Sequence, residues 1–175
     1  KLFTDYERLY NLSQVARGRT GDKVSFERYV LASYMDGILE LAFSHLNSMS
    51  SGRYNFIRSD AATTKGGGKK GLDIDVLDSH TGVQRSIKTL SGGESFKASL
   101  SLALALGDFI QSQTSSIEME TLLIDEGFGS LDSESLDSAI ASLMELRGRG
   151  RLVGIISHVE ELRERIPQKI LIEKT

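Results

Sequence analysis

Several residue types and sequence features are missing from this chain. It contains no cysteine and no tryptophan, and Pro167 is its only proline. Without cysteine it can form neither a disulfide scaffold nor a thiolate metal site, as is typical of proteins of the cytoplasm. No apolar run reaches the roughly 20 residues that span a membrane, and the N-terminus has no signal-peptide pattern. We therefore expect a cytoplasmic protein without a membrane partner.

The size and charge of the chain fit one ordinary globular unit. Its 175 residues are 39% apolar and 26% charged, and no proline- or serine-rich linker divides them. The formal net charge is only −3, so any binding of nucleic acid must depend on local basic patches. The chain opens with Lys1 and not with methionine, and we expect it to be a piece of a longer protein.

Helical periodicity runs through the first fifty residues. Residues 1–17 have apolar residues near a heptad seam, so that 1–20 is either the end of a coiled coil or a short packed helix. After a glycine-containing break, a longer amphipathic helix is predicted over 26–49, and we expect its apolar face to lie in the core.

Alternating polar and apolar residues predict a small antiparallel region next. Its strands are predicted over 52–59, 72–79 and 82–87, and the last two are joined by a hairpin turn. The segment 63–71, TTKGGGKKG, is rich in Gly and Lys and could contact phosphate or DNA. We interpret it instead as a hairpin loop.

The second half of the chain alternates apolar strands with helices. Strands are predicted over 121–126, 151–158 and 168–174, and helices over 133–148 and 159–166. This alternation is typical of a parallel sheet covered by helices on both faces. The predicted fold is therefore α/β, with a mostly parallel sheet flanked by helices and a small antiparallel hairpin region.

Two of the predicted parallel strands end in chemically active side chains. Asp125 and Glu126 end the first strand, and His158 ends the second. Ligands bind beyond the carboxyl ends of the strands in open parallel sheets, so these residues are expected at one edge. Mg²⁺ takes one or two carboxylates together with substrate phosphates, a role that suits Asp125. Glu126 could polarise an attacking water, and His158 could donate a hydrogen bond to a γ-phosphate.

The segment SGGE opens the helix that follows the antiparallel region. Ser91 alone would cap this helix, whereas Gly92 and Gly93 weaken it, because glycine in a helix costs about 1 kcal/mol relative to alanine. Glycines at a helix N-terminus let backbone N–H groups approach an anion closely. Taken alone, the segment is better interpreted as a turn followed by a cap.

Four motifs in order resemble the C-terminal half of an ABC-type ATPase head. They are LSGGE at 90–94, TLLIDE at 121–126, SLD at 130–132 and ISH at 156–158. In such heads they are the signature motif, the Walker B strand, the D-loop and the switch histidine. The wording of DEGFGSLDSESLD and GIISHVEELRERIP resembles the SbcC family, bacterial relatives of the eukaryotic Rad-fifty DNA-repair ATPases.

The resemblance implies roles for three residues at the nucleotide of the same head. Asp125 would serve Mg²⁺, through a water. Glu126 would act on the attacking water, and His158 would contact the γ-phosphate.

The resemblance also implies a surface that binds the nucleotide of a second head. Ser91, Gly92, Gly93 and Glu94 would form it, with Ser91 and Gly93 contacting the γ-phosphate. Asp132 would couple the two heads across their interface.

One motif of the family does not occur in this chain. The P-loop pattern G-x-x-x-x-G-K-[ST] is absent. In SbcC-type proteins this motif lies in an N-terminal half, beyond a long coiled coil. We therefore expect 21–175 to be a C-terminal half-domain that neither binds ATP and Mg²⁺ tightly nor hydrolyses ATP alone. The implied partners are that N-terminal half, a second head, an SbcD-type nuclease and DNA, in the processing and repair of double-strand breaks and hairpins.

Two other interpretations stay open. One is the head of an SMC or RecN-like chromosome clamp, against which the GFGSLD segment argues. The other is a non-catalytic module that docks on a partner through a degenerate ATPase fold. The intact pair of Asp125 and Glu126 argues against degeneration.

Overall fold

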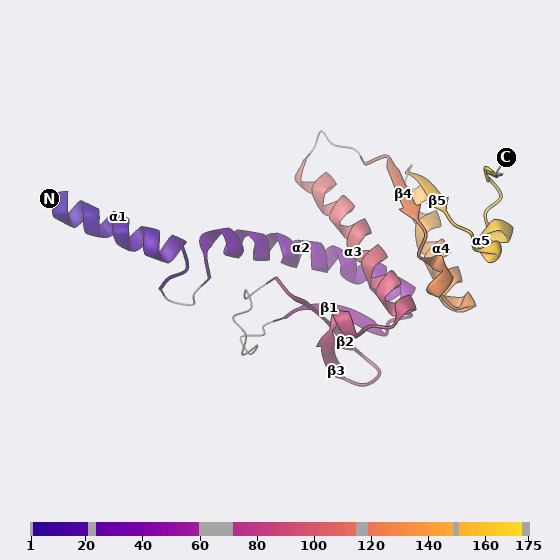
Figure 1. The fold of residues 1–175 in the computed structure, drawn as a ribbon, viewed down its shortest axis with the longest axis horizontal. Coiled ribbons are helices and arrows are strands. Elements are labelled where there is room, and N and C mark those ends of the chain that lie inside the picture. Colours follow the sequence, from indigo (N-terminus) through magenta and orange to yellow (C-terminus); the bar gives the residue numbers. More distant parts are fainter. Residues whose placement is uncertain (1, 21–23, 60–71, 115–118, 149–150, 173–175) are drawn as a thin grey trace.

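The computed structural model describes residues 2–20, 24–59, 72–114, 119–148 and 151–172. It begins with two helices, α1 (Leu2–Ala16) and α2 (Phe26–Met49). Both helices were predicted, and α2 has the predicted bounds. Ser25 ends the break between them and caps α2 by accepting a hydrogen bond from the Arg28 backbone N–H. In Figure 1, α1 extends away from the rest of the molecule.

The apolar residues of α1 remain exposed. Phe3, Leu9 and Leu12 are 74%, 67% and 64% accessible. On α2, the buried residues lie toward the C-terminal end, where Leu39, Ala42, Leu46 and Met49 are buried. The predicted core face of α2 is thus only partly in the core: Tyr34, in its first half, is 50% exposed. The exposed stripe on α1 supports the coiled-coil alternative for 1–20, which stays a prediction.

The predicted antiparallel region is present. Strands β1 (Tyr54–Arg58), β2 (Ile74–Asp78) and β3 (Val83–Ser86) form a sheet of order β1-β2-β3. Their bounds lie inside the predicted ranges, and the turn between β2 and β3 uses Gly82 at a φ of +68°. The Gly/Lys-rich loop predicted over 63–71, with Lys65, Lys69 and Lys70, lies outside the described residues.

The long helix α3 (Gly92–Gln113) lies between two hydrophobic clusters. Ala98 and Ala105 belong to one cluster with α2, β1 and β2, while Leu100 and Leu104 belong to another with α4 (Ser133–Gly148). The short 3₁₀ segments η1 (Ile87–Thr89) and η2 (Phe128–Ser130) precede α3 and α4. Figure 1 shows the antiparallel sheet and the remaining strands on different sides of α3.

The parallel part of the fold is a pair of strands. Strand β4 (Thr121–Asp125) pairs in parallel with β5 (Leu152–Ile156), and α5 (Glu160–Arg165) follows. The inner face of the pair packs on the second cluster through Leu122, Ile124, Val153 and Ile155. The α/β fold with a parallel and an antiparallel part is therefore confirmed. In the described part of the chain, no helix is long and apolar enough to cross a membrane.

Two expectations about the parallel sheet were wrong. The sheet is not covered on both faces, because Leu123, Leu152 and Ile156 on its outer face are 72%, 67% and 59% exposed. The strand predicted over 168–174 is also absent, since 168–172 form no strand, and 173–175 lie outside the described residues. A strand needs a neighbouring strand to pair its backbone groups. Within the described residues, β4 and β5 pair only with each other, and this segment has no such neighbour.

Candidate functional site

The parallel pairing brings the predicted acidic residues and the histidine to one edge. Asp125 lies opposite Ile156 in the register of β4 and β5, and the Glu126 backbone N–H donates to the Ile156 carbonyl at 2.8 Å. His158 follows two residues later. The expected placement of Asp125, Glu126 and His158 at the carboxyl ends of neighbouring strands is thus confirmed.

Glu126 and His158 contact each other directly. Nδ1 of His158 lies 2.8 Å from Oε2 of Glu126, and the two side chains are 80% and 46% exposed respectively. Glu126 also has a φ of +59°, in the left-handed region that non-glycine residues seldom adopt. Such a conformation costs on the order of 1–3 kcal/mol and is concentrated at functional sites. The backbone therefore adopts an uncommon conformation at the residue whose carboxylate contacts the histidine.

The loop after Glu126 is fixed against the first turns of α3. Gly127 has a φ of +98°, and a Cβ there would overlap the ring of Phe96. The ring centroids of Phe96 and Phe128 are 4.8 Å apart, and Phe128 is almost completely buried. Only glycine fits both the conformation and the space at 127. This contact joins the end of β4 to the start of α3.

The start of α3 is a capping box. Oγ of Ser91 accepts from the Glu94 backbone N–H at 3.4 Å, and Oε2 of Glu94 accepts from the Ser91 backbone N–H at 2.9 Å. This reciprocal pair satisfies two donors that a helix N-terminus otherwise leaves unpaired. The segment SGGE is therefore a helix cap, whatever else it binds.

One of the two glycines of this segment, Gly93, has a reason within the chain. A Cβ at Gly93 would lie 3.0 Å from the backbone oxygen of Ser130, and one at Gly92 would lie 3.4 Å from Cβ of Ser130. Gly93 therefore permits the close approach of the helix start to the segment before α4. The expectation that the glycines serve a ligand is not needed to explain Gly93, although it is not contradicted.

Glu94 makes further contacts with the antiparallel sheet. The Tyr54 hydroxyl donates to Oε1 of Glu94 at 2.5 Å, and Nη2 of Arg85 donates to Oε2 at 3.2 Å. Burial raises the pKa of Glu94, but these donors and the Ser91 N–H more than offset it and hold the pKa at about 2. Burial, together with the bond to Glu94, raises the pKa of Tyr54 to about 12. The carboxylate of Glu94 is thus fully engaged inside the protein.

Asp132 caps helix α4. The Ser135 backbone N–H donates to Oδ1 of Asp132 at 2.8 Å, and the Ser135 hydroxyl donates to Oδ2 at 2.9 Å. These two bonds lower the pKa of Asp132. Nζ of Lys97, on α3, donates to the same Ser135 hydroxyl oxygen at 3.0 Å. The segment before α4 is thereby linked to α3 by polar contacts as well as by Gly93.

The candidate residues fall into two separate groups, one at the ends of β4 and β5 and one around the start of α3. Among the described residues, no hydrogen bond or ion pair joins Ser91 to Asp125, Glu126 or His158. They also contain no group of three or more acidic or histidine side chains that could hold a metal ion. The exposed carboxylate of Asp125 fits an ion that is bound mainly by waters and substrate phosphates, as Mg²⁺ is.

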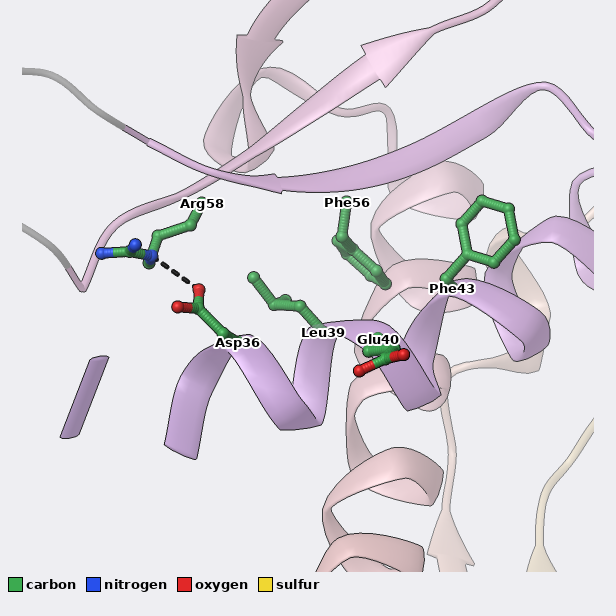
Figure 2. Close-up of a pocket in the computed structure, with 6 residues that line it drawn as sticks. All are labelled: Asp36, Leu39, Glu40, Phe43, Phe56 and Arg58. Atoms are coloured by element: carbon green, nitrogen blue, oxygen red, sulfur yellow. Dashed lines mark hydrogen bonds and ion pairs between the residues drawn. The ribbon is translucent and has the colours of Figure 1, made fainter. Parts of the chain in front are cut away.

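Two hollows of the surface lie away from these residues. One of about 350 Å³ lies beside α2 and β1, where Nε of Arg58 and Oδ1 of Asp36 are 2.6 Å apart (Figure 2). A second, of about 520 Å³, lies where α1 meets α2 and is mainly apolar. No candidate residue lines either hollow. Glu126 and His158 are themselves exposed, so the candidate site is an open edge of the sheet.

Comparison with known proteins identifies the relatives of this chain. The family model described as "SbcC/RAD50-like, Walker B motif" matches residues 71–145. The chain is 50% identical over 165 residues to the SbcC protein of the SbcCD nuclease of Vibrio cholerae, covering 94% of this chain. It is 44% identical over 163 residues to the SbcC protein of Staphylococcus aureus, covering 93% of this chain. This chain belongs to the SbcC family.

The chain corresponds to a small part of these SbcC relatives. It spans 16% of the length of each of the two. Among solved structures, one from work on ATP-driven dimerization and DNA-stimulated activation of SMC ATPases matches with a TM-score of 0.62 and 16% identity, covering 85% of this chain and 83% of that chain. The Smc head of Pyrococcus furiosus, bound to a domain of ScpA, matches with a TM-score of 0.52 and 18% identity, covering 78% of this chain and 32% of that one. At this identity the likeness shows a common fold only.

Three residues that support the SbcC motifs were missed in the sequence. Lys97 lies within α3, while Tyr54 and Arg85 lie on strands well before Glu94. The S-x-x-E spacing of Ser91 and Glu94 signals a capping box. No local pattern signals the contact of Tyr54 with Glu94, because it joins residues 40 positions apart.

Proposed function

We propose that this chain is the C-terminal part of an SbcC-type ATPase head, which hydrolyses ATP only together with a P-loop-bearing N-terminal part of the same protein. The observation that carries this proposal is the contact of Glu126 with His158 at the ends of β4 and β5. A carboxylate and an imidazole held beside each other at the carboxyl edge of a parallel sheet suit the activation of water next to a phosphate.

The residues at this edge have distinct proposed roles. Asp125 would hold Mg²⁺ together with ATP phosphates, and the ion supplies charge neutralisation when it is bound. Glu126 accepts a proton from the attacking water. His158 contacts Glu126 through Nδ1, and its Nε2 donates to an oxygen of the γ-phosphate when both ring nitrogens carry a hydrogen.

The start of α3 has a proposed role at the nucleotide of a second head. Ser91, Gly92 and Gly93 would present a hydroxyl and backbone N–H groups to the γ-phosphate, at the positive end of a helix of 22 residues. Glu94 supports this surface and does not contact the nucleotide itself. Asp132, exposed at the start of α4, would couple the two heads.

The exposed outer face of the parallel pair supports the need for another part. Leu123, Leu152 and Ile156 expose apolar surface on neighbouring positions of β4 and β5. Soluble proteins normally keep such contiguous apolar patches small, and larger ones mark interaction sites. We propose that the N-terminal part of the head covers this face.

The relatives suggest the process in which such a head acts. Two of them are named as SbcC components of the SbcCD nuclease. We propose that ATP-driven engagement of two heads regulates an SbcD-type nuclease that processes broken and hairpin DNA ends in the cytoplasm. An SMC-like chromosome clamp is the alternative, but the similarity to Smc heads is limited to the fold, whereas the SbcC relatives are 44% and 50% identical.

Complementation tests the proposal. ATP hydrolysis is measured for this chain alone, for the N-terminal part alone and for their mixture. We expect turnover only in the mixture, and none when the P-loop lysine of the N-terminal part is replaced by alanine. Appreciable turnover by this chain alone would contradict the proposal, because it has no P-loop.

A further inference from the structure

Side chains from three elements converge behind the start of α3. They are Tyr54 at the start of β1, Arg85 on β3 and Glu94 in the first turn of the helix. Tyr54 and Arg85 both donate to the carboxylate of Glu94. Glu94 in turn accepts from the backbone N–H of Ser91. The antiparallel sheet is thus connected to Ser91 through one carboxylate.

Arg85 holds the chain on both sides of Ser91. Its Nη1 donates to the backbone oxygen of Thr89 at 2.9 Å, and its Nη2 donates to Oε2 of Glu94 at 3.2 Å. One planar guanidinium therefore spans the turn that leads from Thr89 into α3. Lysine, with a single ammonium group, cannot reproduce this forked geometry.

The ring of Tyr54 is held by groups other than Glu94. It is only 4% exposed, and the guanidinium carbons of Arg53 and Arg85 lie 4.8 Å and 5.7 Å from the centre of its ring. Arg53 is itself held by Asp78 on β2, because its Nε donates to Oδ1 and its Nη2 donates to Oδ2 of that carboxylate. Arg53 and Arg85, which lie over the ring, therefore help to fix the direction of the Tyr54 hydroxyl.

These contacts determine which hydrogen bonds the Ser91 hydroxyl can make. Its oxygen accepts from the Glu94 backbone N–H, and a serine hydroxyl has one hydrogen to donate and two lone pairs. Because the oxygen is used as an acceptor inside the cap, the hydrogen stays available to a ligand outside. No described residue accepts it.

We propose that Tyr54 and Arg85 are positioning residues that hold Ser91, through Glu94, in the orientation that donates to the γ-phosphate of the second head. This inference rests on the proposed function of Ser91. It differs from a purely structural role, in which Tyr54 and Arg85 would stabilise the chain without affecting recognition between heads.

The experiment uses the full-length protein with Glu126→Gln, in which engaged heads should persist. The concentration of protein at half-maximal ATP-dependent dimerisation is measured by analytical ultracentrifugation. Adding Tyr54→Phe, which removes only the hydroxyl, should raise this concentration about tenfold, as expected for a lost hydrogen bond to a charged group. Binding of ATP to the monomer at high dilution should not change.

Two matched variants separate positioning from stability. Tyr29→Phe removes the hydroxyl of a tyrosine that is 69% exposed on α2, and it should leave dimerisation unchanged. Leu143→Ala removes buried apolar volume on α4, and it should lower the melting temperature without weakening dimerisation. Arg85→Lys provides a second probe if Tyr54→Phe does not fold, and it should weaken dimerisation in the same way.

The possible failures are distinguishable. If Glu126→Gln alone gives no ATP-dependent dimer, the proposed function is wrong. If that dimer forms but Tyr54→Phe and Arg85→Lys dimerise as the Tyr29→Phe control does, the positioning role is overturned. It is also overturned if Tyr54→Phe weakens ATP binding by the monomer to the same extent.

Discussion

The two halves of the candidate site differ in how firmly they are held. The start of α3 is fixed by a capping box, by Tyr54 and Arg85 behind it, and by the close contact of Gly93 with the segment before α4. The ends of β4 and β5 instead expose their side chains: Glu126 is 46% and His158 80% accessible.

This difference indicates which half is complete within the chain. The surface proposed to meet a second head is organised by contacts that the chain makes with itself. The edge proposed to act on its own nucleotide has its two reactive side chains paired, but the face of the sheet beneath them is open at Leu123 and Leu152. The contact of Phe96 with Gly127 joins the two halves. The most informative substitutions act on one half, or on this contact.

The largest expected effect concerns the exposed ends of β4 and β5. In the complemented head, Glu126→Gln should reduce ATP turnover by about 10²–10⁴-fold, the usual contribution of a positioned general base. The amide oxygen can still accept from Nδ1 of His158, so the local contact and ATP-dependent dimerisation should survive. Steady-state hydrolysis and analytical ultracentrifugation measure the two properties separately.

A neighbouring acid serves as the control for this prediction. Glu120 is exposed just before β4, and its side chain makes no hydrogen bond among the described residues. Glu120→Gln should leave turnover unchanged. Normal hydrolysis by the Glu126→Gln head would show that another group activates the water.

The second prediction concerns the contact of Gly127 with Phe96, which joins the end of β4 to the start of α3. Gly127→Ala places a Cβ against Phe96 and forces alanine into a left-handed conformation. We expect it to lower the free energy of unfolding by about 2–4 kcal/mol, from backbone strain and from overpacking together. Urea denaturation of the chain measures the change.

A second glycine provides the matched control. A Cβ at Gly148, the last residue of α4, would meet no described atom within 4 Å. Gly148→Ala should change stability by no more than about 0.5 kcal/mol. If Gly127→Ala is as mild as Gly148→Ala, the two halves are not held together by this contact.

The sequence predicted what depends on local pattern and on topology. Periodicity located α2 within its observed bounds, and the succession of apolar strands and helices placed Glu126 and His158 at one edge. The rule that parallel strands end on the same side is independent of detailed packing. This is why the candidate edge could be found without a structure.

What the sequence did not predict depends on partners distant in the chain. Residues 168–172 have the apolar pattern of a strand, but a strand forms only where another strand pairs with it. Tyr54 and Arg85 support the signature segment through tertiary contacts with Glu94, and neither lies in a motif. The close contact of Gly93 with Ser130 is also invisible in the sequence, while the ligand role of the glycines stays a prediction.

The smallest expected effect concerns the stability in acid of the contacts that hold the start of α3. The pKa of Glu94 is about 2 in the folded chain, below its ordinary value of 4.5, so its ionised form stabilises the fold above pH 4.5. This contribution is lost as the pH falls from about 4.5 toward 2. Glu94→Gln keeps a residue that can complete a capping box but cannot titrate. The difference in unfolding free energy between the chain and Glu94→Gln should therefore shrink over this interval, as measured by urea denaturation at several pH values. Tyr54→Phe removes one of the donors to Glu94, so the chain with this substitution should show a smaller loss over the same interval. A difference that stays constant from pH 6 to pH 2.5 would mean that the carboxylate of Glu94 is not what fastens the start of α3 to the antiparallel sheet.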